Sequence, residues 1–186
     1  NAGIRVVMVT GDHPDTARKI GEEIGLIAED APEEMVVHGA DLEEIGSLPE
    51  DKQKTLMQAG IFARMVPGQK LDLVEFYQKN KAIVGMLGDG VNDAPALKKA
   101  DIGIAMGIRG TEAAKEVADV ILMDDKFTST ELAIRQGRTI FENIRQFVIF
   151  LLSCNLAEII SVALASLSNL PMPLLPLQIL FLNLIT

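Results

Sequence analysis

Short apolar runs alternate with amphipathic, charge-bearing stretches along the first 127 residues of this chain. The runs are rich in Val, Ile and Met, as buried strands are, because β-branched side chains suit a pleated surface. They predict strands at 4–10, 35–38, 61–65, 82–87, 101–105 and 119–123. The stretches between them predict helices at 14–25, 50–59, 69–79, 94–99 and 111–117. This alternation indicates an α/β fold built on a parallel sheet.

The pattern changes after residue 127, where one helix is predicted to run from 128 to 167. From Phe147 to the last residue, Glu158 is the only charged side chain. About 20 apolar residues cross a bilayer, so this stretch is predicted to be transmembrane, with a buried core helix as the alternative. The predicted parts are an α/β part at 1–127, a stalk helix at 128–146, a transmembrane helix at 147–168 and the truncated start of a second transmembrane helix at 174–186.

Positive charges flank the first apolar span on one side only. Arg135, Arg138 and Arg145 precede it, whereas the loop at 169–173 carries no charge. The positive-inside tendency therefore predicts a multi-pass membrane protein whose α/β part is cytoplasmic. The formal net charge of −9 argues against a nucleic-acid surface, and a single cysteine, Cys154, excludes a disulfide within the chain.

The most specific feature of the sequence is the decapeptide Met86–Pro95, which holds a glycine-flanked acidic loop at 88–93, the twin-aspartate loop. It follows an apolar run, so we expect it at the carboxyl end of a buried strand, where open α/β sheets bind ligands. Asp89 and Asp93 repel each other, and Mg²⁺ relieves such repulsion by taking one or two carboxylates with phosphate oxygens. The alternative is a solvated turn, in which Asp, Asn and Gly are common.

Two further segments follow predicted strands and complete a candidate phosphate site. Thr10, Gly11 and Asp12 end the first strand. The helix that opens at Pro14 would present free backbone amides beside the Thr10 hydroxyl. Lys70 lies in the first turn of the helix after the third strand, from which it would reach the same edge of the sheet. The alternative is a solvated surface lysine, the commoner situation for a single Lys.

A threonine loop, a lysine and a twin-aspartate loop in this order resemble the haloacid dehalogenase superfamily, whose fold is a Rossmann-like parallel sheet. The individual blocks look closer still to the P-type cation-transporting ATPases, and the similarity covers essentially the whole chain. The matching blocks are Val9–Asp12, Pro67 with Lys70, Gly88–Leu97, Ala100–Gly107 and Gly137–Ile144. The resemblance implies an enzyme that hydrolyses ATP through a phosphorylated aspartate and moves a cation across a membrane.

The resemblance also implies roles for single residues. Thr10 and the Gly11 amide would contact phosphate oxygens, and Lys70 would neutralise charge on the aspartyl phosphate. The implied phosphate-facing and catalytic residues are Thr10, Gly11, Asp12, Lys70 and Asn92, and the implied Mg²⁺ ligands are Asp89 and Asp93. Phosphoryl transfer depends mainly on such positioning and charge neutralisation.

The family's phosphorylated residue stands in an Asp-Lys-Thr-Gly-Thr loop that this sequence lacks. The family places that loop, and a nucleotide-binding insertion after it, before the point where this chain begins. We therefore interpret the chain as an internal fragment and predict that it has no ATPase activity alone. The expected cofactors are Mg²⁺ and ATP, and the expected partners are the lipid bilayer, the transported cation and the remaining domains of the same pump.

A charged side chain inside an apolar span is costly, which makes Glu158 a candidate ion ligand. Asn155 precedes it by three residues on the same helical face, and Asn183 and Thr186 repeat this spacing in the second span. Such oxygen-bearing side chains suit a hard cation, although Asn and Thr also form hydrogen bonds between membrane helices. The pattern resembles the calcium-pump branch, so Ca²⁺ is the predicted cargo, with Na⁺, K⁺, H⁺ or Mg²⁺ as alternatives.

Two other classes of function stay open at this point. One is a soluble phosphatase with the same core, against which the apolar tail after Phe147 argues. The other is a non-catalytic module that binds Mg²⁺ or phosphate, or that regulates a pump in trans. The missing nucleophile loop favours this last interpretation for the isolated chain.

Overall fold

The computed structural model of the chain describes residues 3–42, 48–171, 173 and 175–185, and it divides into two compact units. The first unit, Asn1–Lys126, contains strands and helices in alternation. The second, Phe127–Thr186, is helical. All strand pairs of the first unit are parallel, which confirms the predicted α/β fold.

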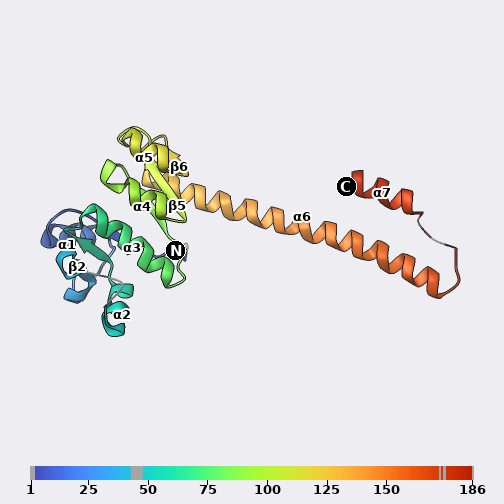
Figure 1. Ribbon diagram of the computed structural model, residues 1–186, viewed down its shortest axis with the longest axis horizontal. Coiled ribbons are helices and arrows are strands. Elements are labelled where there is room, and N and C mark those ends of the chain that lie inside the picture. The colour runs from blue at the N-terminus through green and yellow to red at the C-terminus, as the bar shows by residue number, and fades with distance from the viewer. Residues whose placement is uncertain (1–2, 43–47, 172, 174, 186) are drawn as a thin grey trace. The chain divides into compact units, whose positions relative to one another are not determined.

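The first half of the α/β unit, blue to green in Figure 1, holds a three-stranded sheet in the order β1-β3-β2. Its elements are β1 (Met8–Val9), α1 (Pro14–Glu23), η1 (Glu33–Met35), β2 (Val36–His38), η2 (Gly39–Leu42), α2 (Glu50–Gln58), β3 (Ile61–Ala63) and α3 (Pro67–Lys79). Pro14 and Pro67 open α1 and α3, because the fixed φ of proline suits a first helical turn and its missing N–H costs nothing there.

The second half of the unit holds another three-stranded parallel sheet, in the order β4-β5-β6. Its elements are β4 (Gly85–Gly88), η4 (Val91–Asp93), α4 (Ala94–Lys99), β5 (Ile102–Met106), α5 (Glu112–Val117) and β6 (Val120–Leu122). The twin-aspartate loop therefore begins at the carboxyl end of β4, as predicted. β1 and β4 are each an edge strand, with a paired neighbour on one side only among the described residues.

The core of the first sheet is centred on β3, whose three residues are fully buried. Ile61 and Ala63 share a cluster with Ala17 of α1, while Phe62 shares another with Leu73 of α3. This alternation follows from the period of two in a strand, which sends successive side chains to opposite faces. A smaller core of Leu97, Ala105 and Ala114 supports the second sheet.

The edge strands β1 and β4 are shorter or more exposed than the sequence predicts. β1 covers only part of the expected 4–10, and Ile4 is 51% exposed. Ile83, just before β4, is 85% exposed, and only Gly88 is buried within β4. The prediction of a buried strand at 82–87 is therefore wrong in its burial, because β4 has a paired neighbour on one side only among the described residues.

The second unit consists of α6 (Phe127–Leu167) and α7 (Pro176–Ile185). α6 is a single helix of 41 residues, in agreement with the helix predicted over 128–167 (Figure 1). Within the described ranges it is the one helix long and apolar enough to cross a membrane. One face of its apolar part is less exposed than the rest, and this face comprises Leu151, Cys154, Glu158, Val162 and Ala165.

Candidate functional site

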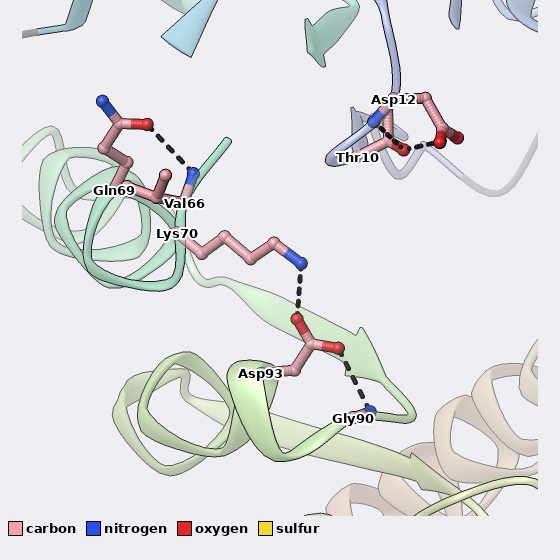
Figure 2. Close-up of polar contacts among 7 residues, drawn as sticks. All are labelled: Thr10, Asp12, Val66, Gln69, Lys70, Gly90 and Asp93. Carbon is pink, nitrogen blue, oxygen red and sulfur yellow. Dashed lines mark hydrogen bonds and ion pairs between the residues drawn. The ribbon is translucent and has the colours of Figure 1, made fainter. Parts of the chain in front are cut away.

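The loop that follows β1 is organised by its own side chains, as Figure 2 shows. The Thr10 hydroxyl donates to Asp12 Oδ2 at 2.9 Å and accepts the Asp12 amide at 3.1 Å. The Thr10 amide donates to the Phe62 carbonyl oxygen at 2.9 Å, which anchors the loop to β3. A Cβ at Gly11 would meet no atom within 4 Å, so a ligand can approach the loop there.

The loop that follows β3 is bonded to this first loop. The Arg64 amide donates to the Asp12 carbonyl oxygen, and the Met65 amide donates to the Thr10 carbonyl oxygen, both at 3.0 Å. Arg64 has φ 56°, a left-handed conformation that is uncommon for residues other than glycine. Sequence reasoning missed this residue, because nothing in the neighbouring residue types marks a left-handed position.

Lys70 lies in the first turn of α3 and is largely buried rather than solvated. Its side chain is 15% exposed, and its Nζ donates to Asp93 Oδ1 at 2.6 Å (Figure 2). The start of α3 is held by Gln69, whose Oε1 accepts the Val66 amide at 3.1 Å and whose Nε2 donates to the Gly39 carbonyl oxygen at 2.7 Å. Lys70 therefore reaches the strand-end region, as one of the two predictions for it required.

Asp93 is the buried member of the twin-aspartate loop and ends the short helix η4. One carboxylate oxygen accepts Lys70, and the other accepts the Gly90 amide at 3.3 Å. A Cβ at Gly88 would lie 2.6 Å from the Asp93 Cβ, so the strand end needs a glycine at this point. The ion pair joins a helix after β3 to a loop after β4, and it therefore links the two halves of the α/β unit.

Asp89 and Asn92 are exposed, and the Asp89 carbonyl oxygen accepts the Thr111 amide at 2.8 Å. Mg²⁺ prefers oxygen ligands and takes only one or two carboxylates from a protein in phosphate-transfer sites. An exposed Asp89 carboxylate in one loop with the Asp93 carboxylate fits that requirement. The described part of the chain holds no group of three or more His, Cys, Asp or Glu residues suited to a metal.

Comparison with known families settles the relationship of this α/β unit. Residues 1–101 match the model of the haloacid dehalogenase-like hydrolases. The chain belongs to this family. Membership agrees with the α/β architecture and parallel strand pairing of the first unit. It also makes the first unit, rather than the helical one, the place to look for hydrolytic chemistry.

Curated relatives of this haloacid dehalogenase-like chain match its whole length. It is 45% identical to a calcium-transporting ATPase of Bacillus subtilis and 46% identical to the cation-transporting ATPase pma1 of Synechocystis, in both cases over 100% of this chain and 20% of the relative. It is 42% identical to the sodium/potassium-transporting ATPase subunit alpha-3 of Gallus gallus, over 99% of this chain and 20% of that protein. The chain thus spans about a fifth of these relatives.

A solved structure of the catalytic domain of the CPx-ATPase CopB-B is also similar, with a TM-score of 0.50 and 26% identity. The match covers 71% of this chain and 39% of that one. It agrees with the haloacid dehalogenase-like architecture of the first unit.

The predicted site residues are not all brought into contact. Lys70 and Asp93 form one group and Thr10 and Asp12 another, and Figure 2 draws no hydrogen bond or ion pair between the two groups. Asn92 stays on the exposed side of η4. The two groups therefore share the strand-end region of one unit without direct bonding, and a ligand would have to join them.

The predicted ion ligands are described only in part. Asn155 is exposed and Glu158 is half-buried on α6. The backbone of Asn183 lies in α7, and Thr186 lies outside the described residues. The ion site therefore stays a prediction.

Proposed function

We propose that these residues form the C-terminal part of the phosphorylation domain of a P-type cation-transporting ATPase, together with adjoining membrane helices. The observation that carries the proposal is the ion pair between Lys70 and Asp93, which joins two strand ends beside an exposed second carboxylate, Asp89. The relatives that match the whole chain are named as cation, calcium or sodium/potassium pumps, and this supports the same assignment.

The proposed chemistry is the stabilisation of a phosphoryl group by fixed charges and amides. Lys70 Nζ offsets negative charge on the transferred group, and its ion pair with Asp93 sets its position beforehand. The Thr10 hydroxyl would exchange its bond with Asp12 for a phosphate oxygen, and the Gly11 amide would donate to another. Asp89 and Asp93, with Asn92 beside them, would hold Mg²⁺, which neutralises phosphate charge when bound.

The phosphate acceptor is proposed to be an aspartate outside this chain, in keeping with the missing Asp-Lys-Thr-Gly-Thr loop. The edge strands β1 and β4 support this, because exposed apolar residues such as Ile4 and Ile83 lie close to them. An edge strand offers unpaired N–H and C=O groups to a further strand. A strand from another part of the parent protein would pair there and carry the acceptor at its carboxyl end.

The parent protein is proposed to be a multi-pass membrane protein with the α/β unit in the cytoplasm. α6 supports a membrane location, since its apolar part is long enough to cross a bilayer. Arg135, Arg138 and Arg145 stand on α6 before that apolar part, as the positive-inside tendency requires of a cytoplasmic side. The apolar helix α7 would begin the next crossing.

Ca²⁺ is the proposed cargo. Glu158 and Asn155 of α6 would supply oxygen ligands, and Asn183 and Thr186 would add two more. The identity with a calcium-transporting ATPase, 45%, is close to that with a sodium/potassium-transporting subunit, 42%. Overall similarity therefore does not separate the two cargoes, and a cation titration does.

The test is phosphorylation of the full-length protein that contains these residues. Purified protein is incubated with labelled ATP and Mg²⁺ while Ca²⁺, Na⁺, K⁺ or H⁺ is varied. We expect an acid-stable label on the full-length protein that depends on Ca²⁺, and none on the 186-residue chain alone. A full-length protein that takes up no label with any cation would overturn the pump proposal, and dependence on another cation would replace Ca²⁺ only.

A further inference from the structure

The loop that follows β5, residues 107–111, closes around the carboxylate of Asp125. Asp125 Oδ1 accepts the Ile108 amide at 2.9 Å, and Oδ2 accepts the Arg109 amide at 2.7 Å. The Arg109 guanidinium adds an ion pair at 3.3 Å, and the Asp125 side chain is only 9% exposed. Asp125 itself has φ 52°, a left-handed conformation that Asp and Asn tolerate better than most residues.

Two glycines show that this loop is closely packed. A Cβ at Gly107 would lie 2.7 Å from the Leu122 carbonyl oxygen, and a Cβ at Gly110 would overlap the Met106 carbonyl oxygen. The Gly107 amide also donates to the Leu122 carbonyl oxygen at 2.9 Å. The loop is therefore held against the end of β6 at Leu122, three residues before Asp125.

The last residue of the loop bonds to the twin-aspartate loop. The Thr111 amide donates to the Asp89 carbonyl oxygen at 2.8 Å. Thr111 is also the N-cap of α5, where its hydroxyl accepts the Ala114 amide at 3.4 Å. A continuous path of short bonds thus runs from the Asp125 carboxylate, through loop 107–111, to the backbone of Asp89.

Another aspartate in this sheet also binds a backbone amide, but at the opposite end of the strands. Asp101 accepts the Val84 amide at 2.8 Å just before β5 begins, whereas loop 107–111 follows the end of β5. Asp125 therefore differs from Asp101 in its location at the carboxyl end, where the twin-aspartate loop lies. Asp125 is therefore placed to act on the site, whereas Asp101 is placed to act on the fold alone.

We propose that Asp125 is a positioning residue for Asp89, acting through loop 107–111 and the Thr111 amide. The inference rests on the proposed function, because it takes Asp89 as a Mg²⁺ ligand. Without the Asp125 carboxylate, the Ile108 and Arg109 amides lose their acceptor and the loop gains freedom. The Asp89 backbone then loses a fixed donor, so its carboxylate is less well placed for Mg²⁺. Residues that orient metal ligands change metal affinity by about 10–100-fold.

The test uses the full-length protein with matched variants. Asp125→Asn keeps the shape and the tolerance of positive φ but removes one acceptor oxygen and the charge. Asp125→Gly also accepts the left-handed backbone and removes the whole side chain. Arg109→Ala removes only the guanidinium contact and leaves both backbone amides. Asp101→Asn is the control, because it weakens a similar carboxylate–amide bond at the other end of β5.

Two readouts are taken without any turnover. Titration calorimetry measures Mg²⁺ affinity, and hydrogen exchange in the absence of Mg²⁺ measures protection of the 108–111 amides. We expect Asp125→Asn and Asp125→Gly to weaken Mg²⁺ binding about tenfold and to speed exchange in this loop. We expect a smaller shift in Arg109→Ala and wild-type values in Asp101→Asn.

Three results would overturn the inference: unchanged Mg²⁺ affinity in the Asp125 variants, unchanged exchange in loop 107–111, or an equal shift in Asp101→Asn. If neither Asp125 variant folds, unchanged Mg²⁺ affinity in Arg109→Ala overturns it. Wild-type protein that binds no Mg²⁺, or Asp89→Asn protein that binds it normally, overturns the proposed metal site and this inference with it. Faster exchange in the Asp125 variants would then still show that Asp125 holds the loop at 107–111, even though the metal assignment had failed.

Discussion

Several polar side chains in the α/β unit bond to residues far along the chain, whereas several on α6 bond within one helical turn. Lys70 and Asp93 are 23 residues apart, and Asp101 accepts an amide 17 residues away. On α6, Arg135 pairs with Glu131, and the Ser153 and Ser161 hydroxyls donate to carbonyl oxygens, in each case four residues earlier.

This contrast shows how each region can build a site. Parallel strands place their carboxyl ends on the same side, so side chains from distant segments, such as Lys70 and Asp93, can meet there. A single helix presents only neighbours three or four residues apart, and it needs a second helix to complete a ligand shell. Phosphoryl chemistry should therefore depend on residues that the first unit already brings together, whereas cation affinity should depend on residues of α6 together with those of a second helix.

The largest expected effect is that of Asp89→Asn in the full-length protein. Losing a Mg²⁺ carboxylate should cost about 4 kcal/mol of transition-state stabilisation, or roughly 10³-fold in the rate of phosphorylation by ATP. Nucleotide binding should persist, because the proposed nucleotide domain lies outside these residues. Rapid-quench phosphorylation checks this, with Asp72→Asn on the exposed side of α3 as the control. Equal phosphorylation rates in Asp89→Asn and wild type would show that the twin-aspartate loop is not part of the site.

Lys70→Ala should slow phosphoryl transfer by roughly 10²-fold, since fixed donors to developing charge contribute on that scale. The matched control is Lys79→Ala at the other end of α3, where the lysine is 73% exposed and its nearest carboxylate oxygen is 3.8 Å away. The same quench measurement reports both. A similar slowing in the two variants would mean that Lys70 acts through general stability rather than through the site.

Glu158→Gln tests the helical side of the comparison. It keeps the shape of the side chain, removes the charge, and should raise the activating Ca²⁺ concentration about tenfold or more, because ligand charge tunes Ca²⁺ affinity. Phosphorylation from inorganic phosphate, which needs no transported ion, should stay nearly unchanged. Glu142→Gln, in the polar part of α6, is the control. Coincident Ca²⁺ curves for Glu158→Gln and wild type would exclude Glu158 as a ligand.

The smallest expected effect concerns acid stability. The Val84 amide and the Gln78 side chain hold the pKa of Asp101 below its ordinary value. A carboxyl with a lowered folded-state pKa stabilises the fold above its unfolded pKa of about 3.9, and this contribution disappears as the pH falls through the lowered value. The unfolding temperature of wild type should therefore decrease at pH values below about 4, and this decrease should be smaller in Asp101→Asn.

Glu131→Gln is the counterpart on α6. Arg135 lowers the pKa of Glu131 as well, first through a hydrogen bond and then through its charge. Both carboxylates are exposed, so water and salt screen each of them. The Glu131 contact joins residues only one helical turn apart, whereas Asp101 joins segments 17 residues apart, so the acid limb should change less in Glu131→Gln than in Asp101→Asn. A larger change in Glu131→Gln would show that the one-turn contact contributes more to acid stability than the long-range contact.

Most element boundaries could be predicted from local residue types. Apart from β1 and β4, the predicted strand and helix ends of the α/β unit lie within two residues of the observed ones. Pro14 and Pro67 mark helix starts through their own ring geometry. β1 and β4 were mispredicted in length or burial because burial depends on which strands lie beside them, and apolar runs such as that around Ile83 look the same at the centre and at the edge of a sheet.

The sequence by itself determined the list of candidate site residues, since Thr10, Lys70 and Asp89 each follow a strand or lie in the first turn of a helix, and this pattern can be read from residue order. Only the tertiary structure decided that Lys70 pairs with Asp93 and that Asp125 binds the loop at 107–111. These contacts depend on which strand ends meet at one edge and on backbone angles such as the left-handed φ at Asp125. The spacing of residues along the chain predicts neither the meeting of strand ends nor these backbone angles, because the three-dimensional fold sets both.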